Sequence, residues 1–262
     1  MRRSAPHSIT RASIGIIISA ALVALFPPAR SEARQLEIDP VQRAEQGAGE
    51  ITWRVKTERK VVALTIDDGP DPKYTPTVLA IARQKGIKLT FFLVGREVEL
   101  HPDLARREVA EGHAVGNHTW DHPLLIRETA AEDIAEIKRC QDQVESVCGR
   151  RTRLFRPPWG LWDEDAFVEA ERLGYRMILW TVGVEHHSAK TPEAMAQRVL
   201  DEVRPGAIIL AHDGEPNGPI DRSKTMKALP LIIDRLQEQG YRFVTLPELL
   251  RIGRRTRRSE AS

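Results

Sequence analysis

The sequence has few of the features that mark several large classes of protein. Its 262 residues include only two cysteines, and its most apolar run, Ile14 to Phe26, is about 13 residues long. A helix that crosses a bilayer needs roughly 20 apolar residues, so this run is short of a membrane span. No internal repeat or low-complexity linker is present. No glycine-rich phosphate loop follows the first predicted strand, which argues against a nucleotide-binding fold.

The two cysteines lie in or just beyond a predicted helix from Ala130 to Val147, in which apolar residues recur at helical spacing. A continuous helix would hold Cys140 and Cys148 roughly 12 Å apart. That separation exceeds the reach of a disulfide. We therefore expect two free thiols, unless the helix ends early and an oxidising compartment lets them pair.

The N-terminus has the pattern of an export signal. Arg2, Arg3 and Arg11 precede the apolar run, and Ser31-Glu32-Ala33 offers small residues where a signal peptidase cleaves. The pattern predicts a signal peptide over residues 1–33 and a secreted or periplasmic protein. The alternative is an uncleaved N-terminal anchor, and without it we expect no stable membrane insertion.

The charge balance depends on this signal. Residues 1–33 hold four Arg and one Glu of the 39 basic and 37 acidic residues, so 35 and 36 remain after cleavage. The mature chain is nearly neutral. Its composition therefore gives no reason to expect a nucleic-acid partner.

The rest of the chain alternates between short apolar strands and helical segments, which predicts an α/β fold with parallel strands, either a barrel or an open doubly wound sheet. We divide it into a lead-in over residues 34–54, a single domain over 55–250 and a basic tail over 251–262. The predicted strands are 61–66, 89–94, 114–116, 154–155, 177–180, 207–211 and 242–245. The predicted helices are 75–84, 102–111, 130–147, 163–173, 192–203 and 224–239.

Two carboxylates directly follow the first predicted strand. The β-branched apolar run Val61 to Ile66 suits a buried strand, and Asp67 and Asp68 come next, before Gly69-Pro70. In α/β folds, catalytic groups collect at the carboxyl ends of strands. The alternative is that the two Asp residues only cap the next helix or shape a turn.

A second polar stretch contains His118 and His122. Residues four apart lie on one side of a helical turn, so both imidazoles could converge on one metal ion. Two ligands alone do not make a site, and histidine is also a common polar surface residue. Asp68 is available as a third ligand. Two histidines and one carboxylate leave positions open for water and substrate, as in catalytic metal sites.

Several short motifs together resemble the polysaccharide deacetylases that share the NodB homology domain, carbohydrate esterase family 4. The resemblance spans roughly residues 55–250 in the family's order, and a series of motifs is far more specific than one. It implies a distorted (β/α) barrel. The motifs are Thr65-Ile66-Asp67-Asp68-Gly69-Pro70-Asp71, Leu89 to Gly95, His118-Thr119-Trp120-Asp121-His122, Phe155-Arg156-Pro157-Pro158-Trp159-Gly160, Ile208 to Asp213 and Gly240 to Leu246.

The resemblance also implies a cofactor. In the family, the second Asp of the first motif and the two histidines hold a divalent ion, which assigns Asp68, His118 and His122 as ligands. We expect Zn²⁺ first, with Co²⁺, Ni²⁺ or Mn²⁺ as alternatives, because such a ligand set accepts several first-row ions.

The catalytic roles follow from the same resemblance. Asp67 matches the family's general base, and Arg156 matches the arginine that pairs with that base. The backbone N–H of Trp159 matches the oxyanion donor, and His212 matches the histidine that protonates the leaving amine.

One part of the family pattern is altered. After Trp180-Thr181-Val182 the family usually has an Asp, a second Asp three residues on, and then a Trp; here those places hold Gly183, His186 and His187. The second Asp normally supports the catalytic histidine. Glu185 stands one place earlier and could take its place if the loop is shifted; otherwise we expect weak activity or a different amide substrate.

These observations predict an exported, metal-dependent hydrolase that removes N-acetyl groups from an N-acetylated glycan such as peptidoglycan or a chitin-like polysaccharide. The alternatives are a hydrolase of another small amide or ester with the same ion, and a catalytically weak glycan-binding homologue. The retained Asp67 favours an enzyme. The sequence specifies neither the glycan nor the oligomeric state.

Overall fold

A computed structural model describes residues 51–218 and 220–260, with side chains described up to Thr256. The predicted signal peptide, residues 1–33, and most of the predicted lead-in lie outside this range. Among the described residues, none of the helices is both long and apolar enough to cross a membrane.

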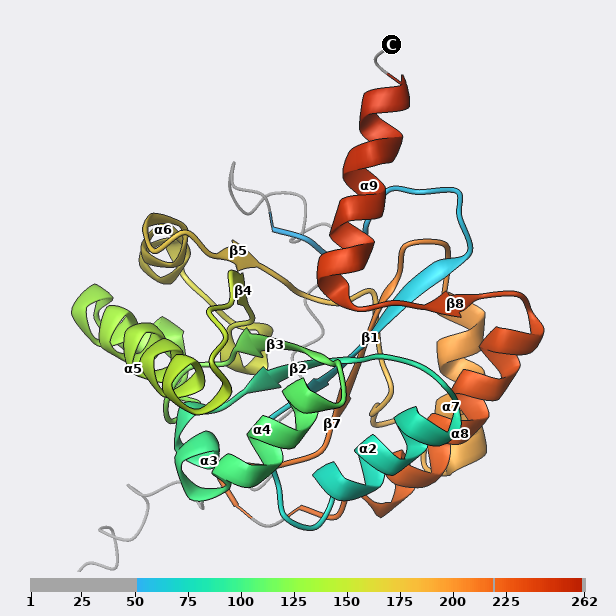
Figure 1. Cartoon of the computed structure of the whole chain (residues 1–262), viewed down its shortest axis with the longest axis horizontal. Helices are drawn as coiled ribbons and strands as arrows, with labels where there is room; N and C mark the ends of the chain where they lie inside the picture. Colours follow the sequence, from blue (N-terminus) through green and yellow to red (C-terminus); the bar gives the residue numbers. More distant parts are fainter. Residues whose placement is uncertain (1–50, 219, 261–262) are drawn as a thin grey trace, which may run out of the picture. The chain divides into compact units, whose positions relative to one another are not determined.

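Short parallel strands form one sheet that curls into a half-barrel with helices around it (Figure 1). The order is β5-β4-β3-β2-β1-β7-β6, and β8 pairs with the start of β1. This confirms the predicted α/β class and distorted barrel. The strands are β1 Val61–Asp67, β2 Thr90–Leu93, β3 Ala114–Asn117, β4 Leu154–Phe155, β5 Arg176–Met177, β6 Val182–Gly183, β7 Ile208–His212 and β8 Arg242–Phe243.

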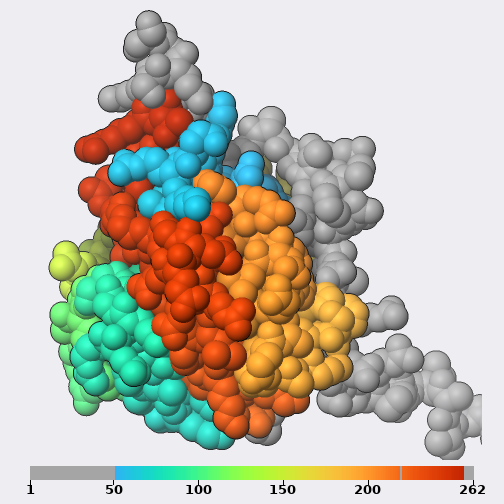
Figure 2. Space-filling model, turned by 90° about the vertical axis from the view of Figure 1, so that its right-hand side faces the viewer, coloured from blue at the N-terminus to red at the C-terminus, as the bar shows by residue number. Residues whose placement is uncertain are grey.

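The helices that connect these strands agree with the six predicted ranges to within about one residue at most ends, whereas α3, α9 and strand β6 were not predicted. Figure 2 shows α2, α8 and α7 side by side on one face. The helices are α2 Thr75–Gln84, α3 Gly95–Leu100, α4 Pro102–Ala110, α5 Ala130–Cys148, α6 Glu164–Arg172, α7 Pro192–Glu202, α8 Ser223–Glu238 and α9 Leu246–Glu260.

Helix α5 has strong signals at both ends. The Thr129 hydroxyl accepts the backbone N–H of Glu132, whose side chain bonds back to the backbone N–H of Thr129, so the two form a capping box. The helix ends at Gly149, whose φ of 61° is left-handed. It therefore runs through both cysteines, and Cys140 and Cys148 are free thiols, as predicted.

Strand β1 is buried on both faces and separates two parts of the core. Its residues alternate, because successive side chains of a strand point to opposite faces. Val62, Leu64 and Ile66 belong to the large cluster that includes α2, α7 and α8 side chains. Val61 and Ala63 belong to a second cluster that includes Leu246, Leu249 and Ile252 of α9. The face that carries Val61 and Ala63 continues through residues 65 and 67 toward the carboxyl end of the strand.

The packed structure extends beyond the predicted limits of residues 55 and 250. Thr52 bridges to Ile178 and Arg54 to Ala207, so residues 52–54 pair with the sheet. Helix α9 passes through residue 250 without a break, because Ile252 continues the apolar stripe of Leu249 and is buried. A Cβ on Gly206, where φ is +81°, would lie 1.8 Å from the Val55 carbonyl oxygen, so only glycine allows this close approach.

Candidate metal and catalytic site

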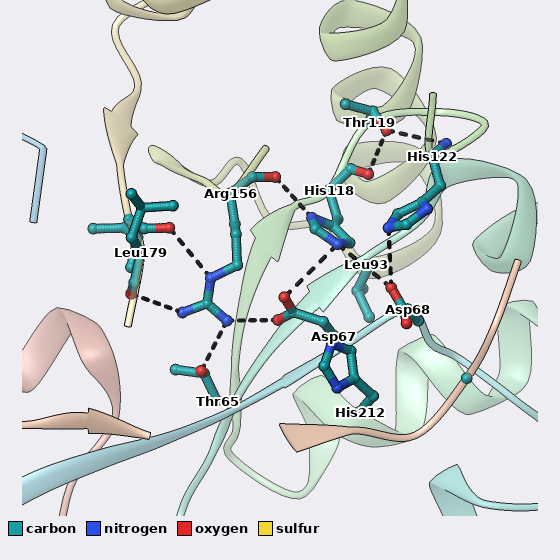
Figure 3. A network of polar contacts seen from close by, with 12 residues as sticks. Thr65, Asp67, Asp68, Leu93, His118, Thr119, His122, Arg156, Leu179 and His212 are labelled. Atoms are coloured by element: carbon teal, nitrogen blue, oxygen red, sulfur yellow. Dashed lines mark hydrogen bonds and ion pairs between the residues drawn. The ribbon is translucent and has the colours of Figure 1, made fainter. Parts of the chain in front are cut away.

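The predicted site residues converge at the carboxyl edge of the sheet (Figure 3). Asp67 ends β1 and Asp68 follows it, while the two histidines follow β3. Arg156 follows β4, and His212 ends β7 beside Asp67 in the strand register. Five of these residues are buried, each with at most 5% of its surface exposed: Asp67, Asp68, His118, His122 and Arg156. Strands far apart in the sequence therefore place these groups around one point.

The two adjacent carboxylates point in different directions because the backbone turns between them. Asp67 still has strand geometry, whereas Asp68 has a φ of 78°, which is left-handed. The turn is anchored by the neighbouring loop, since the Asp213 N–H donates to the Asp67 carbonyl at 3.2 Å. Gly69 is required there, because a Cβ on it would lie 2.5 Å from Asp213 Oδ1. Asp68 is thereby aimed at the loop after β3.

Three side chains form a candidate ligand set for a metal ion. One potential ligand atom from each of Asp68, His118 and His122 lies within 4.8 Å of the other two. Asp68 Oδ1 is 3.3 Å from His122 Nε2 and 3.5 Å from His118 Nε2. This oxygen is buried and has no hydrogen-bond partner among the described residues. A buried, unpartnered carboxylate oxygen beside two imidazole nitrogens is a donor set that suits a first-row divalent ion.

Electrostatics keep Asp68 ionised. Burial alone would raise the pKa of its carboxyl, but His122 and His118 lower it, and the net pKa lies well below the ordinary value. An ionised carboxylate is the form that binds a metal. The electrostatics of the site are therefore consistent with the ligand set.

The two histidines lie in a loop, so the predicted helical turn is wrong. Side chains hold this loop in place of helical hydrogen bonds: Asn117 Oδ1 accepts the Thr119 N–H at 2.9 Å, and Thr119 Oγ1 accepts the His122 N–H at 3.1 Å. Both Thr119 and His122 have left-handed φ values, 68° and 58°. The rings nevertheless converge, with centroids 4.9 Å apart. The spacing of the two histidines therefore predicted correctly that their rings converge, but it predicted the wrong backbone conformation.

Neighbouring groups orient both imidazoles. His118 Nδ1 is 2.7 Å from the Arg156 carbonyl oxygen. Because a carbonyl can only accept, Nδ1 carries a proton, and Nε2, which faces Asp68, is the nitrogen left for a metal ion. Asn217 Nδ2 lies 2.9 Å from His122 Nδ1 and can only donate to it, so metal binding through Nε2 would require the amide to turn its oxygen toward a protonated Nδ1. The outer nitrogen of each predicted histidine ligand therefore has a partner.

Arg156 is fully buried and holds Asp67 in place. Its Nη1 donates to Asp67 Oδ1 at 2.6 Å and to Thr65 Oγ1 at 2.9 Å. Its Nε donates to the Ile178 carbonyl and its Nη2 to the Leu179 carbonyl, each at 3.2 Å. The guanidinium is thus paired with a charge and hydrogen-bonded on every side, the condition under which a buried ion is tolerated. The pairing of Arg156 with Asp67 agrees with the expectation from sequence.

His212 is supported by Glu185, which the sequence left open. His212 Nδ1 is 3.2 Å from Glu185 Oε2, and Thr225 Oγ1 donates to Glu185 Oε1 at 2.8 Å. Burial alone would lower the pKa of His212, but the Glu185 carboxylate outweighs it, and the pKa is raised above its ordinary value. The carboxylate comes one residue earlier than in the family pattern and still reaches the imidazole.

Trp159 occupies a short 3₁₀ turn, Pro158–Gly160, directly after β4. It has a left-handed φ of 61°, and its ring packs 5.1 Å from the His122 ring. In the described part of the chain, its backbone N–H donates no hydrogen bond. The predicted oxyanion donor is therefore free to bind another group. The rings of the two loop histidines, His186 and His187, lie with centroids 4.1 Å apart; His186 is half-buried and His187 is exposed.

Sequence reasoning missed three residues that contact the site. Arg222 is buried, donates to Asp68 Oδ2 at 3.3 Å and also donates to the Gly214 carbonyl. Asn217 contacts His122, and Thr65 bridges Arg156 to the Ile209 carbonyl at 2.8 Å. Thr65 could have been found, since it shares the β1 face of Asp67. Arg222 and Asn217 lie in the long segment after β7, where no spacing rule applies.

The fold and this geometry define a class of α/β half-barrel protein with a buried carboxylate–histidine cluster at the carboxyl edge of its sheet. Comparison with known proteins identifies the family. Residues 54–178 match the family model described as polysaccharide deacetylase. The chain belongs to the polysaccharide deacetylase family, and it is a hydrolase that acts on carbon–nitrogen bonds other than peptide bonds.

Individual relatives agree with this assignment. A peptidoglycan-N-acetylglucosamine deacetylase from Bacillus cereus is 38% identical over 208 residues, which cover 78% of this chain and 94% of that protein. A chitooligosaccharide deacetylase from Azorhizobium caulinodans is 35% identical over 202 residues, which cover 74% and 96%. The crystal structure of the Bc1960 peptidoglycan N-acetylglucosamine deacetylase superposes with a TM-score of 0.74 at 31% identity and covers 81% of this chain and 97% of that one. These relatives support deacetylation of a glycan.

Proposed function

We propose that this protein is an exported, metal-dependent deacetylase that removes N-acetyl groups from an N-acetylated glycan of the cell envelope, such as peptidoglycan or a chitin-like polymer. The observation that carries the proposal is the buried, unpartnered Asp68 Oδ1, which faces Nε2 of both His118 and His122. Buried polar atoms without partners are rare in folded proteins. The named activities of the relatives supply the substrate class.

Asp68, His118 and His122 would hold the ion, with Zn²⁺ as the first candidate and Co²⁺, Ni²⁺ or Mn²⁺ as alternatives. When bound, such an ion lowers the pKa of water and polarises an acetamide carbonyl. The proton transfers and the positioning are then left to four other groups of the chain: Asp67, Arg156, His212 and the backbone N–H of Trp159.

Asp67 is the proposed general base. Its Oδ2 is 3.7 Å from His118 Nε2, so it faces the same space as the ligand set, while Oδ1 is held by Arg156. One carboxylate oxygen is thus fixed and the other is available to take a proton from an attacking water. Arg156 acts here as a positioning residue.

His212 is the proposed acid. The raised pKa that Glu185 gives it keeps more of the imidazolium near neutral pH. It can then protonate the leaving amine of the sugar. The backbone N–H of Trp159 would stabilise the oxyanion, because a donor fixed in advance needs no reorganisation as charge develops.

The location of Glu185 favours the enzyme over a catalytically weak glycan-binding homologue. The alternative of a weak homologue assumed that the altered loop has lost the carboxylate that supports His212. Glu185 Oε2 lies 3.2 Å from His212 Nδ1 and supplies such a carboxylate. A hydrolase of another small amide or ester would use the same groups, so it differs only in substrate.

The decisive experiment measures acetate release from peptidoglycan, chitin oligomers and acetylated xylan. Each substrate is tested with purified protein as isolated, after chelation, and after restoration with each candidate ion. We expect release from an N-acetylated glycan that chelation abolishes and an ion restores. Release only from xylan would replace the amide with an ester substrate. Undiminished release after exhaustive chelation would contradict the role of the ion.

A further inference from the structure

A cavity of 710 Å³ lies at the amino edge of the sheet, opposite the catalytic edge. It is bounded by the starts of β3, β4 and β5 and by one side of α9. We call it the arginine pocket, because six arginines line it and no Asp or Glu is among its described lining residues. The arginines are Arg150, Arg151, Arg153, Arg176, Arg251 and Arg254.

This concentration of positive charge is not a consequence of a basic chain. The formal net charge of all 262 residues is only +2. The arginines come from three separate segments: the loop before β4, the start of β5, and α9. The fold therefore gathers them at one place, and the basic run that the sequence showed at residues 251–258 contributes two of them.

Most of these guanidiniums have no anionic partner within the described residues. Arg150, Arg153, Arg251 and Arg254 are exposed and have no described carboxylate within 4.0 Å. Arg151 forms one ion pair, with Glu145 at 3.4 Å, and both side chains are largely exposed. Some exposed arginines elsewhere have partners, as Arg106 has Asp103 and Arg172 has Glu169, whereas others, such as Arg83 and Arg235, have no described carboxylate within 4.0 Å. What distinguishes the pocket is that six arginines gather in one concave lining that contains no described carboxylate.

The shape and lining indicate the ligand. The guanidinium fork matches phosphate oxygens in a bidentate manner. The cavity volume lies within the range of small-molecule sites, roughly 300–1,000 Å³. Val115, Leu154 and Leu250 add apolar surface beside Tyr175, a lining that suits the apolar face of a sugar ring. A flat membrane surface would not reach into a concave pocket of this kind.

We propose that the arginine pocket binds a phosphorylated saccharide. The ligand is either a free sugar phosphate or a phosphorylated unit within a longer envelope glycan, since both present the same chemistry to the arginines. This binding site is separate from the deacetylase site and does not depend on the proposed function. Its occupation would leave the catalytic edge of the sheet open to substrate.

The test uses glucose 1,6-bisphosphate as the monomeric probe and isothermal titration calorimetry on the purified full chain. The test variant is the pair Arg153→Gln and Arg254→Gln, which removes two charges from the pocket. The matched control is the pair Arg83→Gln and Arg235→Gln, which removes two exposed charges from α2 and α8. We expect the pocket pair to weaken binding about tenfold or more and the control pair to leave it unchanged.

Further arms distinguish the source and the alternatives. A soluble phosphodiester-linked glycan is the polymeric probe. If it binds more tightly than the bisphosphate, and if the pocket pair abolishes this binding, the ligand is the polymer. Equal weakening by both pairs would overturn the proposal in favour of diffuse attraction. Binding only to phosphatidylglycerol vesicles, binding of inorganic phosphate as tight as that of the sugar, or binding of neither saccharide probe would also overturn it.

Two controls protect the interpretation. Circular dichroism checks that each variant folds, and the pair Arg150→Gln and Arg251→Gln replaces the first if that one does not. Deacetylation of a chitin oligomer is measured in all variants. We expect it to be unchanged in the pocket variants, so a failure of the deacetylase proposal would not be confused with a failure of this one.

Discussion

The two edges of one sheet hold arginines in opposite circumstances. At the carboxyl edge, Arg156 is fully buried, and each of its three guanidinium nitrogens donates to a protein oxygen, four bonds in all, to Asp67, Thr65 and two carbonyls. At the amino edge, Arg153 and Arg251 are exposed, with no described carboxylate within reach. A guanidinium that is fully paired inside the protein can only position other groups, whereas an unpaired one can bind an external anion. The same residue type therefore has different uses at the two ends of a strand.

The two edges should differ most in their effect on metal content and activity when a metal-binding side chain is replaced. We expect Asp68→Ala or His118→Ala to lose metal and activity together, because three ligands are the minimum for useful affinity. Arg251→Gln, at the amino edge, should keep both. Metal content by atomic emission and acetate release test this directly. A stoichiometric ion in either ligand variant would show that the assignment is wrong.

The next largest difference should be in the free energy of unfolding when an arginine of each edge is replaced. Arg156→Met leaves the Asp67 carboxylate buried without its partner, which we expect to lower the free energy of unfolding by about 3–5 kcal/mol. Arg153→Gln should change it by no more than about 0.5 kcal/mol, as for an exposed side chain. Urea denaturation of both variants at the same pH makes the comparison. Similar values for the two would mean that the buried pair contributes nothing particular to the fold.

Within the carboxyl edge, the two adjacent carboxylates should differ from each other. Asp67→Asn should retain the ion and lose turnover by about a hundredfold or more, as expected when a general base is removed. The amide oxygen of Asn can still accept from Arg156, so the fold should persist. Metal content and kcat are measured on the same preparation. Near-normal turnover would mean that Asp67 is not the base.

A smaller effect is expected at the outer nitrogen of a ligand. Asn217→Ala removes the amide beside His122 Nδ1, and loss of such an outer contact typically weakens metal affinity about 10–100-fold. Gln197→Ala, an exposed amide on α7, is the matched control. Competition with a chromogenic chelator measures the affinity. If the two variants bind equally well, Asn217 does not orient His122.

The smallest effect should be a shift in a pH profile. The pKa of His212 is raised, so its imidazolium is present at low pH and is lost as pH rises through that pKa. Glu185→Gln removes the negative charge that favours the imidazolium, so the alkaline limb of the kcat profile should move to lower pH. His186→Ala should leave the limb in place. An unmoved limb in the Glu185 variant would remove Glu185 from the support of His212.

The sequence predicted the parts of this fold that depend on local pattern. The apolar run before Asp67 identified β1, and the helix from Ala130 was correctly predicted from its apolar spacing alone. The motifs identified the family, and with it a half-barrel that places Asp68 near His118 and His122. Each of these predictions rests on residues that are close together in the chain or on motifs in a known order.

The parts that the sequence did not predict depend on tertiary contacts. The loop of His118 and His122 is held by Asn117 and Thr119, whose hydrogen bonds compete with a helix in a way that spacing does not reveal. Helix α9 was missed because its arginine-rich sequence hides a short apolar stripe. Arg222 lies 154 positions after Asp68 in the chain, and no local sequence pattern predicts the contact between the two.

The unbroken course of α9 past residue 250 has a consequence for protein engineering. A Cβ on Gly253 would lie 2.3 Å from Val55 Cγ1, so the first described segment and the middle of α9 pack closely together at the amino edge. A chain that begins at Ile51 and ends after Gly253 could have its two ends joined by a short linker. Circular permutants of this domain, opened in an exposed loop, should therefore retain the sheet and its catalytic edge.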